Sequence, residues 1–323
     1  MIRGGVDKMV SQKQIRQAVE VSKLYYLKGM TQAEIARELN LSRPTVSRAI
    51  QFARDQRIVQ VKIDDPLHDI HSLSQQLKKK YHLSQVIVAE PVDDEPHSIL
   101  TAIGKATAQL LPTLVQDNDI IGVSWGQTLN AVAKYLQPSD RNHIQVVYLK
   151  GTVANSTHNN FVVNVTKAFN KNFHTQAQIL PLPVIFDNAK IKSMVVQDHF
   201  IDQILTTAKH VNVAVFTVGT TEDNATLFSL GYLNTSEIKK LQRTAVGDIV
   251  SQFVDEQGQI VDPELAKRTM AIPLDVLKAT RQSILVAGGM NKLPAIKAAL
   301  NGRYANVLVT DLHNAQALLD ENE

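Results

Sequence analysis

Residues 31–54 read TQAEIARELNLSRPTVSRAIQFAR and carry the pattern of a helix-turn-helix. Thr31 is a residue type that caps helix N-termini, and Glu34, three positions later, completes a capping box. We therefore expect a first helix over residues 32–38. Asn40-Leu41 predicts the turn that follows this helix.

The second half of the stretch predicts the helix that would meet DNA. Ser42 is a second N-cap, and Pro44 falls in the first helical turn, where a missing N–H costs nothing. Val46 and Ile50 share the inner face, which leaves hydroxyl, amide and guanidinium groups for contacts with phosphates and base edges. The residues that we expect at DNA are Thr31, Gln32, Arg43, Pro44, Thr45, Ser47, Arg48 and Gln51.

The alternative is a pair of amphipathic helices in an ordinary bundle. The spacing of the two caps and the turn opposes it, and so does the charge. Residues 1–60 contain 11 Lys and Arg against 5 Asp and Glu, whereas the rest of the chain contains 23 against 26. The positive charge therefore lies where a polyanion would be met, and the predicted partner is double-stranded operator DNA.

The composition limits the class of protein. A length of 323 residues suggests two domains, and 44% hydrophobic residues suffice for a full core. No stretch approaches the ~18 apolar residues of a membrane span, and MIRGGVDKMV at the start lacks the apolar run of a signal peptide. There is no cysteine, which excludes disulfides and thiolate chemistry. We expect a cytoplasmic protein that has no membrane partner.

The region around the motif completes a DNA-binding domain over residues 1–66. Residues 1–12 resemble a disordered leader. A helix over 13–28, ending at Gly29, places Ile15, Val19 and Leu24 at core spacing. The alternating stretch RIVQVKI (57–63) predicts a short strand or wing.

Residues 67–81 predict a helical linker between this domain and an effector domain over residues 82–323. Leu67, Ile70, Leu73 and Leu77 have the spacing of a short coiled-coil seam, which could pair two subunits. The alternative is a helix that packs on its own domain.

From Gln85 onward, short apolar strands alternate with helical stretches. Strands are expected at 85–90, 119–125, 144–150, 211–219, 283–289 and 306–311, and helices at 127–136, 160–172, 235–252, 293–301 and 313–321. Several strands are apolar on both faces, as in a parallel sheet that helices cover. The predicted fold is a doubly wound, Rossmann-like α/β domain.

Four expected strand ends carry glycine and polar residues, and ligands of such sheets bind beyond the carboxyl ends of the strands. These ends are SWGQT (124–128), KGT (150–152), GTT (219–221) and GGMNK (288–292). Taken singly, each could be a routine turn between a strand and a helix. The first and last are the best phosphate candidates, because glycine exposes backbone N–H groups and Lys292 adds a charge.

Common nucleotide and metalloprotease motifs are missing. The sequence has no G-x-x-x-x-G-K-[ST], G-x-G-x-x-G or H-E-x-x-H, and its ten His residues show no metal-ligand spacing. We therefore expect no metal and no cofactor. The predicted ligand is a small phosphorylated metabolite, not ATP or NAD.

Lys150 follows the apolar run VVYL and precedes a glycine. A lysine that loses its hydration there, near another cation, would have its neutral amine favoured, and a neutral amine can form a Schiff base with an aldehyde. The other reading is a charged lysine that pairs with a phosphate or an acid. Chemistry alone favours this second reading.

The order of motifs resembles the SorC family of bacterial sugar-responsive transcription regulators, and most of all its deoxyribonucleoside-responsive members in Gram-positive bacteria. The resemblance covers nearly the whole chain. It is carried by residues 25–48, GVSWGQTL (122–129), VVYLKG (146–151), LPLPVIFDN (180–188), NVAVFTVGT (212–220), AVGDI (245–249), ILVAGG (284–289) and YANVLVTD (304–311).

The resemblance implies an effector domain with the fold of sugar-phosphate isomerases, which binds its ligand without turnover. It implies that deoxyribose 5-phosphate releases the protein from DNA and that Lys150 of L-K-G forms a Schiff base with its aldehyde. Its other implied effector-binding residues are Gly126, Gln127 and Thr128 as a phosphate cradle, Gly151, Asn159, Thr220, Asp248 as an acceptor for sugar hydroxyls, and Lys292. Relatives often have a second glycine where this chain has Thr152, which puts close backbone approach to the ligand in question.

Three functions remain to be compared. The first is a repressor, a homodimer or homotetramer on a palindromic site, that a sugar phosphate releases. The second is a sugar-phosphate isomerase or Schiff-base aldolase, for which Asp187, Asp223 and Asp248 are candidate bases. The third is the same regulator with another, non-covalent phosphosugar effector. We favour the first, a regulator and not an enzyme.

Overall fold

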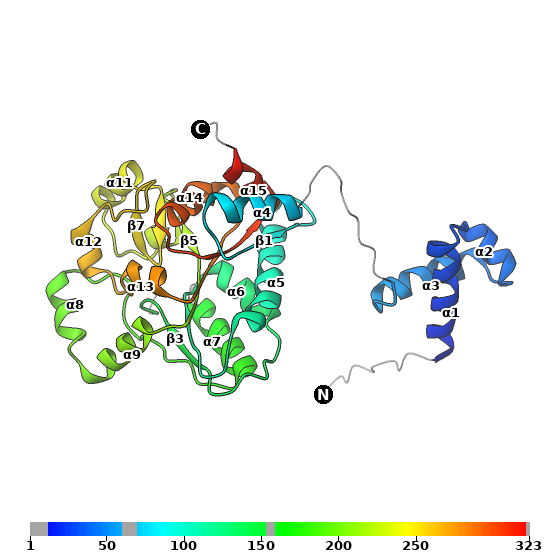
Figure 1. The fold of residues 1–323 in the computed structure, drawn as a ribbon, viewed down its shortest axis with the longest axis horizontal. Coiled ribbons are helices and arrows are strands. Elements are labelled where there is room, and N and C mark those ends of the chain that lie inside the picture. The colour runs from blue at the N-terminus through cyan, green and yellow to red at the C-terminus, as the bar shows by residue number, and fades with distance from the viewer. Residues whose placement is uncertain (1–11, 60–69, 153–158, 321–323) are drawn as a thin grey trace, which may run out of the picture. The chain divides into compact units, whose positions relative to one another are not determined.

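The computed structural model describes residues 12–59, 70–152 and 159–320. The chain divides into two compact units, Met1–His68 and Asp69–Glu323 (Figure 1). The expected leader lies outside the described residues except for Gln12, which begins a helix. Residues 60–63 of the expected wing lie outside them too. Residues 57–59 form a turn and a bend and no strand, so that prediction is wrong for this part.

The first unit is a small helical domain around one apolar cluster. Its elements are α1 (Gln12–Ser22), the π-helix η1 (Lys23–Leu27), α2 (Gln32–Glu38) and α3 (Arg43–Asp55). The buried core includes Val21, Leu24, Ile35, Val46 and Ile50. The expected inner face of the first helix was right only in part: Leu24 is buried, but Val19 is half-buried and Ile15 is 40% exposed, while Ala18 and Val21 are buried instead. Pairing with α3 sets this phase, because α1 packs on α3 and only one stripe can face it.

Both caps of the helix-turn-helix are confirmed. The backbone N–H of Thr31 donates to Glu34 Oε2 at 2.8 Å, and the N–H of Glu34 donates to Thr31 Oγ1 at 3.3 Å. The hydroxyl of Thr31 also donates to Glu34 Oε2, at 2.8 Å, and the two bonds that this carboxylate accepts lower the pKa of Glu34. The N–H of Thr45 donates to Ser42 Oγ at 3.3 Å, and Asn40 adopts φ +51° in the turn. The local sequence alone thus determines where the two helices begin.

The second unit is built on a six-stranded parallel sheet with the order β1-β9-β8-β4-β2-β3. The strands are β1 (Gln85–Ala89), β2 (Ile120–Val123), β3 (Gln145–Tyr148), β4 (Val213–Phe216), β8 (Gln282–Val286) and β9 (Val307–Asp311). All six expected strand regions are confirmed, and so is the α/β class. Parallel pairing places all six carboxyl ends at one edge of the sheet.

Helices cover both faces of this sheet (Figure 1). One face is covered by α5 (Pro96–Leu114), α6 (Gln127–Tyr135) and α7 (Asn159–Phe173), and the other by α4 (Ile70–Lys80), α9 (His199–Lys209), α13 (Leu274–Ala279), α14 (Leu293–Asn301) and α15 (Leu312–Leu319). Alternate strand residues such as Val146 and Val147 enter different cores, and both are fully buried. Each buried side chain of this size contributes about 1.5–3 kcal/mol.

Helix α4 occupies the described part of the expected linker, and it packs on its own domain. It contacts β1 and α15, and Leu77 is fully buried between them. The next residue after α4, Tyr81, donates its hydroxyl to Leu318 O at 3.1 Å, and Lys80 Nζ donates to Leu319 O at 3.3 Å. Of the apolar seam, Leu77 is therefore part of the core of this unit, Ile70 and Leu73 are half-buried, and Leu67 lies outside the described residues.

A second, three-stranded antiparallel sheet lies at the C-terminal side of β4. It consists of β5 (Val218–Gly219), β6 (Gly247–Ile249) and β7 (Gln252–Val254). The expected helix over 235–252 is wrong in its second half, because α11 ends at Thr244 and Ala245 is already extended. The residues after this point include Val246, Ile249, Val250, Phe253 and Val254, which are β-branched or aromatic and favour strands. Shorter helical segments are α8 (Ala189–Val195), α10 (Thr226–Ser229), α12 (Pro263–Arg268) and the 3₁₀ turn η2 (Met290–Lys292).

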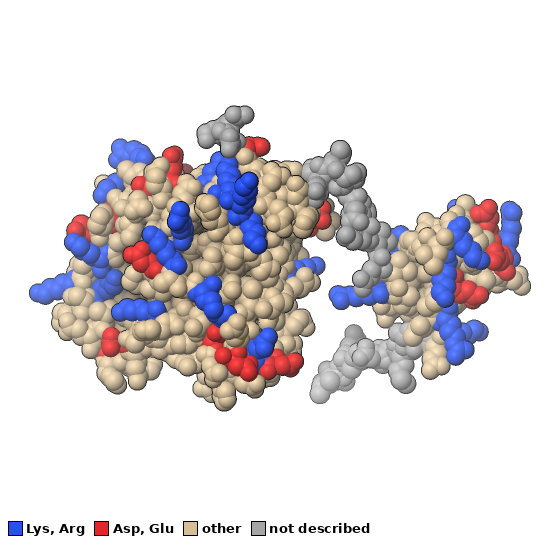
Figure 2. Space-filling view, viewed as in Figure 1, with Lys and Arg blue, Asp and Glu red and all other residues tan. Residues whose placement is uncertain are grey.

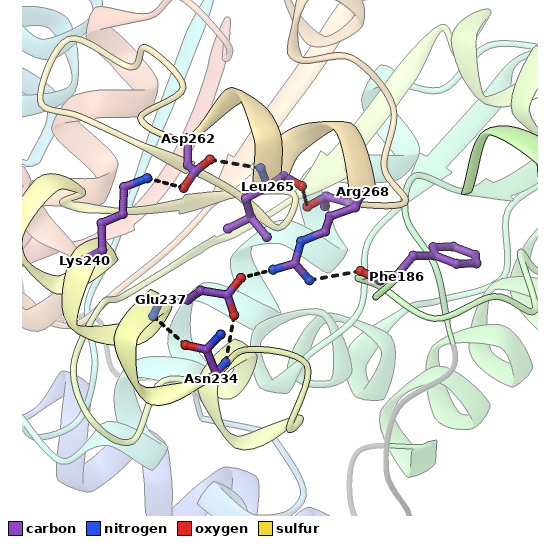
Figure 3. Close-up of polar contacts among 8 residues, drawn as sticks. Phe186, Asn234, Glu237, Lys240, Asp262, Leu265 and Arg268 are labelled. Carbon is purple, nitrogen blue, oxygen red and sulfur yellow. Dashed lines mark hydrogen bonds and ion pairs between the residues drawn. The ribbon is translucent and has the colours of Figure 1, made fainter. Parts of the chain in front are cut away.

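Two ion pairs connect the helices on either side of the β6–β7 hairpin (Figure 3). Helix α11 (Thr235–Thr244) precedes the hairpin and α12 follows it. Lys240 Nζ contacts Asp262 Oδ2 at 2.7 Å, and Arg268 pairs with Glu237 while donating to Phe186 O at 3.0 Å. The segment before the hairpin and the segment after it are thereby joined to each other, and Arg268 also joins them to the backbone of Phe186.

None of the helices within the described ranges is long and apolar enough to cross a membrane.

Candidate functional site

A cavity of about 240 Å³ lies beyond the carboxyl ends of β2, β3, β4 and β8. Its lining includes Gly126, Gln127, Thr128, Lys150, Thr220, Asp248 and Lys292, seven of the nine residues that the sequence assigned to the effector. It also includes Trp125, Thr217, Val218, Gly219, Asn224, Ala225, Thr226, Leu227 and Asn291. Four loops that are far apart in the sequence therefore meet at one place, where the topology of the sheet predicted a site.

Lys150 stands just after β3 with only 8% of its surface exposed. Its backbone bridges that of Ala271, and its Nζ donates to Ser251 Oγ at 3.1 Å. The ring centroid of Trp125 lies 4.5 Å from the same Nζ. Burial lowers the pKa of Lys150, and the charge of Asp248 opposes this shift. The cavity thus contains a primary amine that loses its proton more readily than an exposed lysine does.

Trp125 is anchored behind the cavity by the residue that follows Lys150. Its indole Nε1–H donates to Gly151 O at 2.8 Å, and the N–H of Gly151 donates to Met270 O at 2.8 Å. A Cβ on Gly151 would lie 2.6 Å from Leu182 O. Gly151 is outside the lining of the cavity and instead allows this close packing. Sequence reasoning missed Trp125, although it quoted the loop.

Thr152 does not obstruct the cavity. Its hydroxyl and its N–H both donate to Leu180 O, at 2.7 and 3.0 Å, and the residue is buried outside the cavity lining. Its side chain is therefore directed to residue 180 and does not line the cavity. Asn159 begins α7, and its side chain lies outside the described part of the chain.

Asp248 projects from β6 into the cavity with 8% of its surface exposed. Gly219 is its partner across the sheet, and a Cβ there would lie 2.0 Å from Asp248 Oδ1, so only glycine leaves room for the carboxylate. Asp248 Oδ2 accepts the N–H of Ser251 at 2.8 Å. Burial raises the pKa of Asp248, while the charges of Lys150 and Lys292 lower it.

The turn between β6 and β7 is strained. Ile249 pairs with Gln252, so that Val250 and Ser251 alone form the turn, with φ values of +48° and +67°. A β-branched residue at positive φ is rare, and such strain costs about 1–3 kcal/mol. Val250 is 1% exposed, and burying its side chain contributes about 1.5–3 kcal/mol, which is enough to offset the strain. Sequence reasoning missed Ser251, because it placed a helix here.

Lys292 supplies the second cation of the cavity. Its Nζ donates to Thr128 Oγ1 at 3.3 Å. Loss of hydration lowers its pKa to about 8, against the opposing charge of Asp248. Thr128 lies in the first turn of α6, where the helix dipole favours an anion, and Gly126 before it has φ +141°. Lys292 and the start of α6 together can bind a phosphate dianion.

No group of three or more His, Asp or Glu able to hold a metal ion occurs within the residues described here. The ionisable groups of the cavity are two lysines and one aspartate. They suit an anionic ligand with hydroxyl and carbonyl groups.

The second candidate surface is the outer face of the helix-turn-helix. Of the eight predicted residues, Gln32 and Thr45 are half-buried and the others are exposed. Arg48 Nε donates to Pro44 O at 3.3 Å, which holds its guanidinium along α3. Figure 2 shows a band of Lys and Arg side chains across this small unit. Six of the eight residues expected at DNA are thus exposed on a unit that is rich in Lys and Arg.

Comparison with known proteins finds a family match for each of the two units. A family model of a sugar-binding domain, Sugar-bind, matches residues 65–320, and the model of Sigma-70, region 4, matches residues 23–56. The chain belongs to the SorC family of sugar-binding transcription regulators. The deoxyribonucleoside regulator of Bacillus subtilis (strain 168) is 41% identical over 305 residues, which cover 94% of this chain and 97% of that protein. It follows that this chain is a sugar-responsive transcription regulator.

Relatives whose names give other roles match this chain over nearly its full length. The sorbitol operon regulator of Klebsiella pneumoniae is 32% identical over 316 residues, 96% of this chain and all of that protein. The crystal structure of full-length SorC from the same organism superposes with a TM-score of 0.75 at 29% identity, covering 96% of this chain and 100% of that one. The order of domains is therefore common to these regulators.

Proposed function

We propose that this regulator represses genes of deoxyribonucleoside and deoxyribose breakdown and that deoxyribose 5-phosphate, bound to Lys150 as a Schiff base, releases it from its operator. The observation that carries the proposal is the buried amine of Lys150 in a cavity that also holds Lys292 and Asp248. The name of the Bacillus subtilis relative supports the choice of deoxyribonucleosides.

The phosphate of the effector would lie at the start of α6. Backbone N–H groups near Gly126 and Gln127, the hydroxyl of Thr128 and the ammonium of Lys292 are the donors on this side of the cavity. Asp248 and Thr220 then face the sugar hydroxyls. Gly151 contributes through its packing, and Asn159 stays a further candidate from the sequence.

The Schiff base requires a neutral amine and an aldehyde carbon within its reach. Burial shifts Lys150 toward the neutral form, and the open-chain sugar presents an aldehyde at C1. The amine nitrogen attacks this carbon, and loss of water gives an iminium ion. The nearby carboxylate of Asp248 balances the new positive charge.

The intact mass of the protein, measured after incubation with deoxyribose 5-phosphate and borohydride, tests this proposal. We expect one adduct per chain, on Lys150. Absence of an adduct together with tight binding would favour the same regulator with a non-covalent phosphosugar effector. Consumption of the sugar phosphate would instead indicate an isomerase or aldolase.

Effector binding should change the tryptophan fluorescence. Trp125 is the only tryptophan of the chain, and its ring centroid lies 4.5 Å from Lys150 Nζ. Conversion of this amine to an iminium alters the charge over the ring. We expect a saturable change in emission on titration with deoxyribose 5-phosphate. A Lys150→Met variant that gave the same change would contradict the assigned position of the sugar.

On DNA, we propose that α3 enters the major groove and that two copies in a homodimer or homotetramer read half-sites ~34 Å apart. The residues involved are Thr31, Gln32, Arg43, Pro44, Thr45, Ser47, Arg48 and Gln51, the outer face of the motif. The effector must then bind the DNA-competent and DNA-free assemblies with different affinity.

Replacing Arg48 with Ala should weaken operator binding by about 1–3 kcal/mol, because a guanidinium that pairs with a base edge discriminates by that amount. Binding to unrelated DNA should fall much less. Fluorescence anisotropy with both DNAs at one salt concentration measures the difference. Arg16→Ala, which removes the same charge from the exposed face of α1, is the control. Equal losses on both DNAs would exclude base reading by Arg48.

A further inference from the structure

Ser251 is a fully buried residue that contacts two of the three ionisable groups of the cavity, Lys150 and Asp248. Its Oγ accepts a hydrogen bond from Lys150 Nζ at 3.1 Å, and its backbone N–H donates to Asp248 Oδ2 at 2.8 Å. Nothing in the binding of phosphate or sugar hydroxyls requires this side chain. It lies beside the reactive nitrogen, and its contacts suggest a role in the reaction of that nitrogen.

Two groups flank Lys150 Nζ: the Ser251 hydroxyl at 3.1 Å and the Trp125 ring, whose centroid is 4.5 Å away. A neutral amine has two N–H groups and one lone pair. If one N–H points at the hydroxyl and the other at the face of the ring, the lone pair points elsewhere. Lys150 also lines the cavity, and we infer that the remaining direction leads into it.

We propose that Ser251 is a positioning residue for imine formation: by accepting one N–H of Lys150, it aims the lone pair of the amine at the aldehyde carbon in the cavity. This inference rests on the proposed Schiff base. It adds a residue that neither the sequence motifs nor the comparisons assign.

The backbone conformation around Ser251 also supports a functional role for its side chain. Val250 and Ser251 form the two-residue β6–β7 turn with φ values of +48° and +67°, where asparagine and glycine are the usual residues. Glycine at the second position would leave no side chain beside Lys150. Strained turns persist where the surrounding structure over-determines them, often at functional sites. Here the strain places a hydroxyl against the amine.

The reaction balances with the groups present. The nitrogen lone pair of Lys150 forms the C–N bond, and a proton moves from nitrogen to the former carbonyl oxygen to give a neutral carbinolamine. Asp248, the carboxyl group of the cavity, takes up the proton that Lys150 loses on becoming neutral and gives it to this hydroxyl. The C–O bond breaks, water leaves with the bonding pair, and an iminium ion remains beside the Asp248 carboxylate. Ser251 gives and takes no net proton.

A purely electrostatic role of Ser251 predicts the opposite result. A hydroxyl that accepts from Lys150 stabilises the ammonium form, so its removal would lower the pKa of Lys150 and increase the neutral fraction. Adduct formation would then be faster below that pKa and unchanged at high pH. A positioning role instead predicts a lower rate at high pH, where the amine is already neutral.

The test is the pH profile of adduct formation in the full-length protein, with deoxyribose 5-phosphate and borohydride trapping. For Ser251→Ala we expect the high-pH plateau to fall by about tenfold to a hundredfold, the usual cost of a misplaced reacting group. Binding of 2-deoxyribitol 5-phosphate, an alcohol that cannot form an imine, should change less than twofold. Ser251→Gly removes the hydroxyl and also tolerates φ +67°, so it keeps the test valid if the alanine variant distorts the turn.

Ser283→Ala is the matched control, because Ser283 is another buried serine, 1% exposed, whose hydroxyl donates to Tyr304 O outside the cavity. It should leave the profile unchanged. Unchanged plateaus in both Ser251 variants, with a normal adduct in the unmodified protein, would overturn this inference and leave the proposed function intact. Absence of an adduct in the unmodified protein would instead overturn the proposed function.

Discussion

Replacing Lys150 with Met should abolish the borohydride-stable adduct and weaken deoxyribose 5-phosphate binding by about a hundredfold or more. Methionine has a similar length and apolar body, so the buried stem keeps its packing against Trp125. It has no amine, so neither the imine nor the hydrogen bond to Ser251 can form. A hundredfold loss corresponds to about 2.7 kcal/mol. Intact mass and isothermal titration calorimetry measure the two effects.

Lys192 is the matched control for this prediction. It is also partly buried with a pKa lowered by burial, but its Nζ donates to Thr269 O at 2.6 Å, and it is outside the cavity lining. Lys192→Met should form the adduct as the unmodified protein does. If the adduct persisted in Lys150→Met and disappeared in Lys192→Met, the imine would form at Lys192. The assignment of Lys150 as the reactive lysine would then be wrong.

Replacing Lys292 with Met should lower the affinity for deoxyribose 5-phosphate by about a hundredfold, because a partly buried ammonium that contacts a phosphate contributes about 2–3 kcal/mol. The affinity for 2-deoxyribose, which has no phosphate, should hardly change. Lys297→Met, on α14 but outside the cavity lining, controls for loss of a nearby charge. Equal losses for both sugars would contradict a phosphate role for Lys292.

The pH dependence of binding follows from the same lysine. The pKa of Lys292 is about 8, so the free protein has an ammonium at pH 7 and mostly a neutral amine at pH 9. Binding of an unreactive phosphorylated analogue should therefore weaken as the pH rises from 7 to 9. In Lys292→Met this decrease should disappear. Adduct formation by Lys150 should move the other way, since only its neutral amine reacts.

The DNA-binding motif could be predicted closely from the sequence. Thr31 with Glu34, and Ser42 with Pro44, are local signals, and the helices begin where these residues place them. The phase of α1 could not be predicted, because Ile15 and Val21 are both apolar and only contact with α3 selects the stripe that is buried. The apolar residues of α1 are compatible with more than one buried face, and packing against α3 determines which face is buried.

The candidate site could be predicted in part. Residues at the ends of parallel strands, such as Gln127, Lys150 and Lys292, are brought together by the sheet, so a correct strand assignment was enough to group them. Asp248 was assigned only through the family resemblance, since the surrounding residues were expected to be helical. In the structure α11 ends at Thr244, and the β6–β7 hairpin that follows places Asp248 in the cavity.

By itself, the sequence determined the class of each domain, the caps of the helix-turn-helix and the lysine at the end of β3, because caps and apolar strands depend on neighbours a few residues away. Only the tertiary structure decided that α4 packs on its own domain and that Ser251 meets Lys150, 101 residues away in the chain. Such contacts depend on which surfaces remain to be buried once the sheet has formed. The strained turn at Val250 shows the same dependence, since burial of its side chain offsets a backbone conformation that the local sequence disfavours.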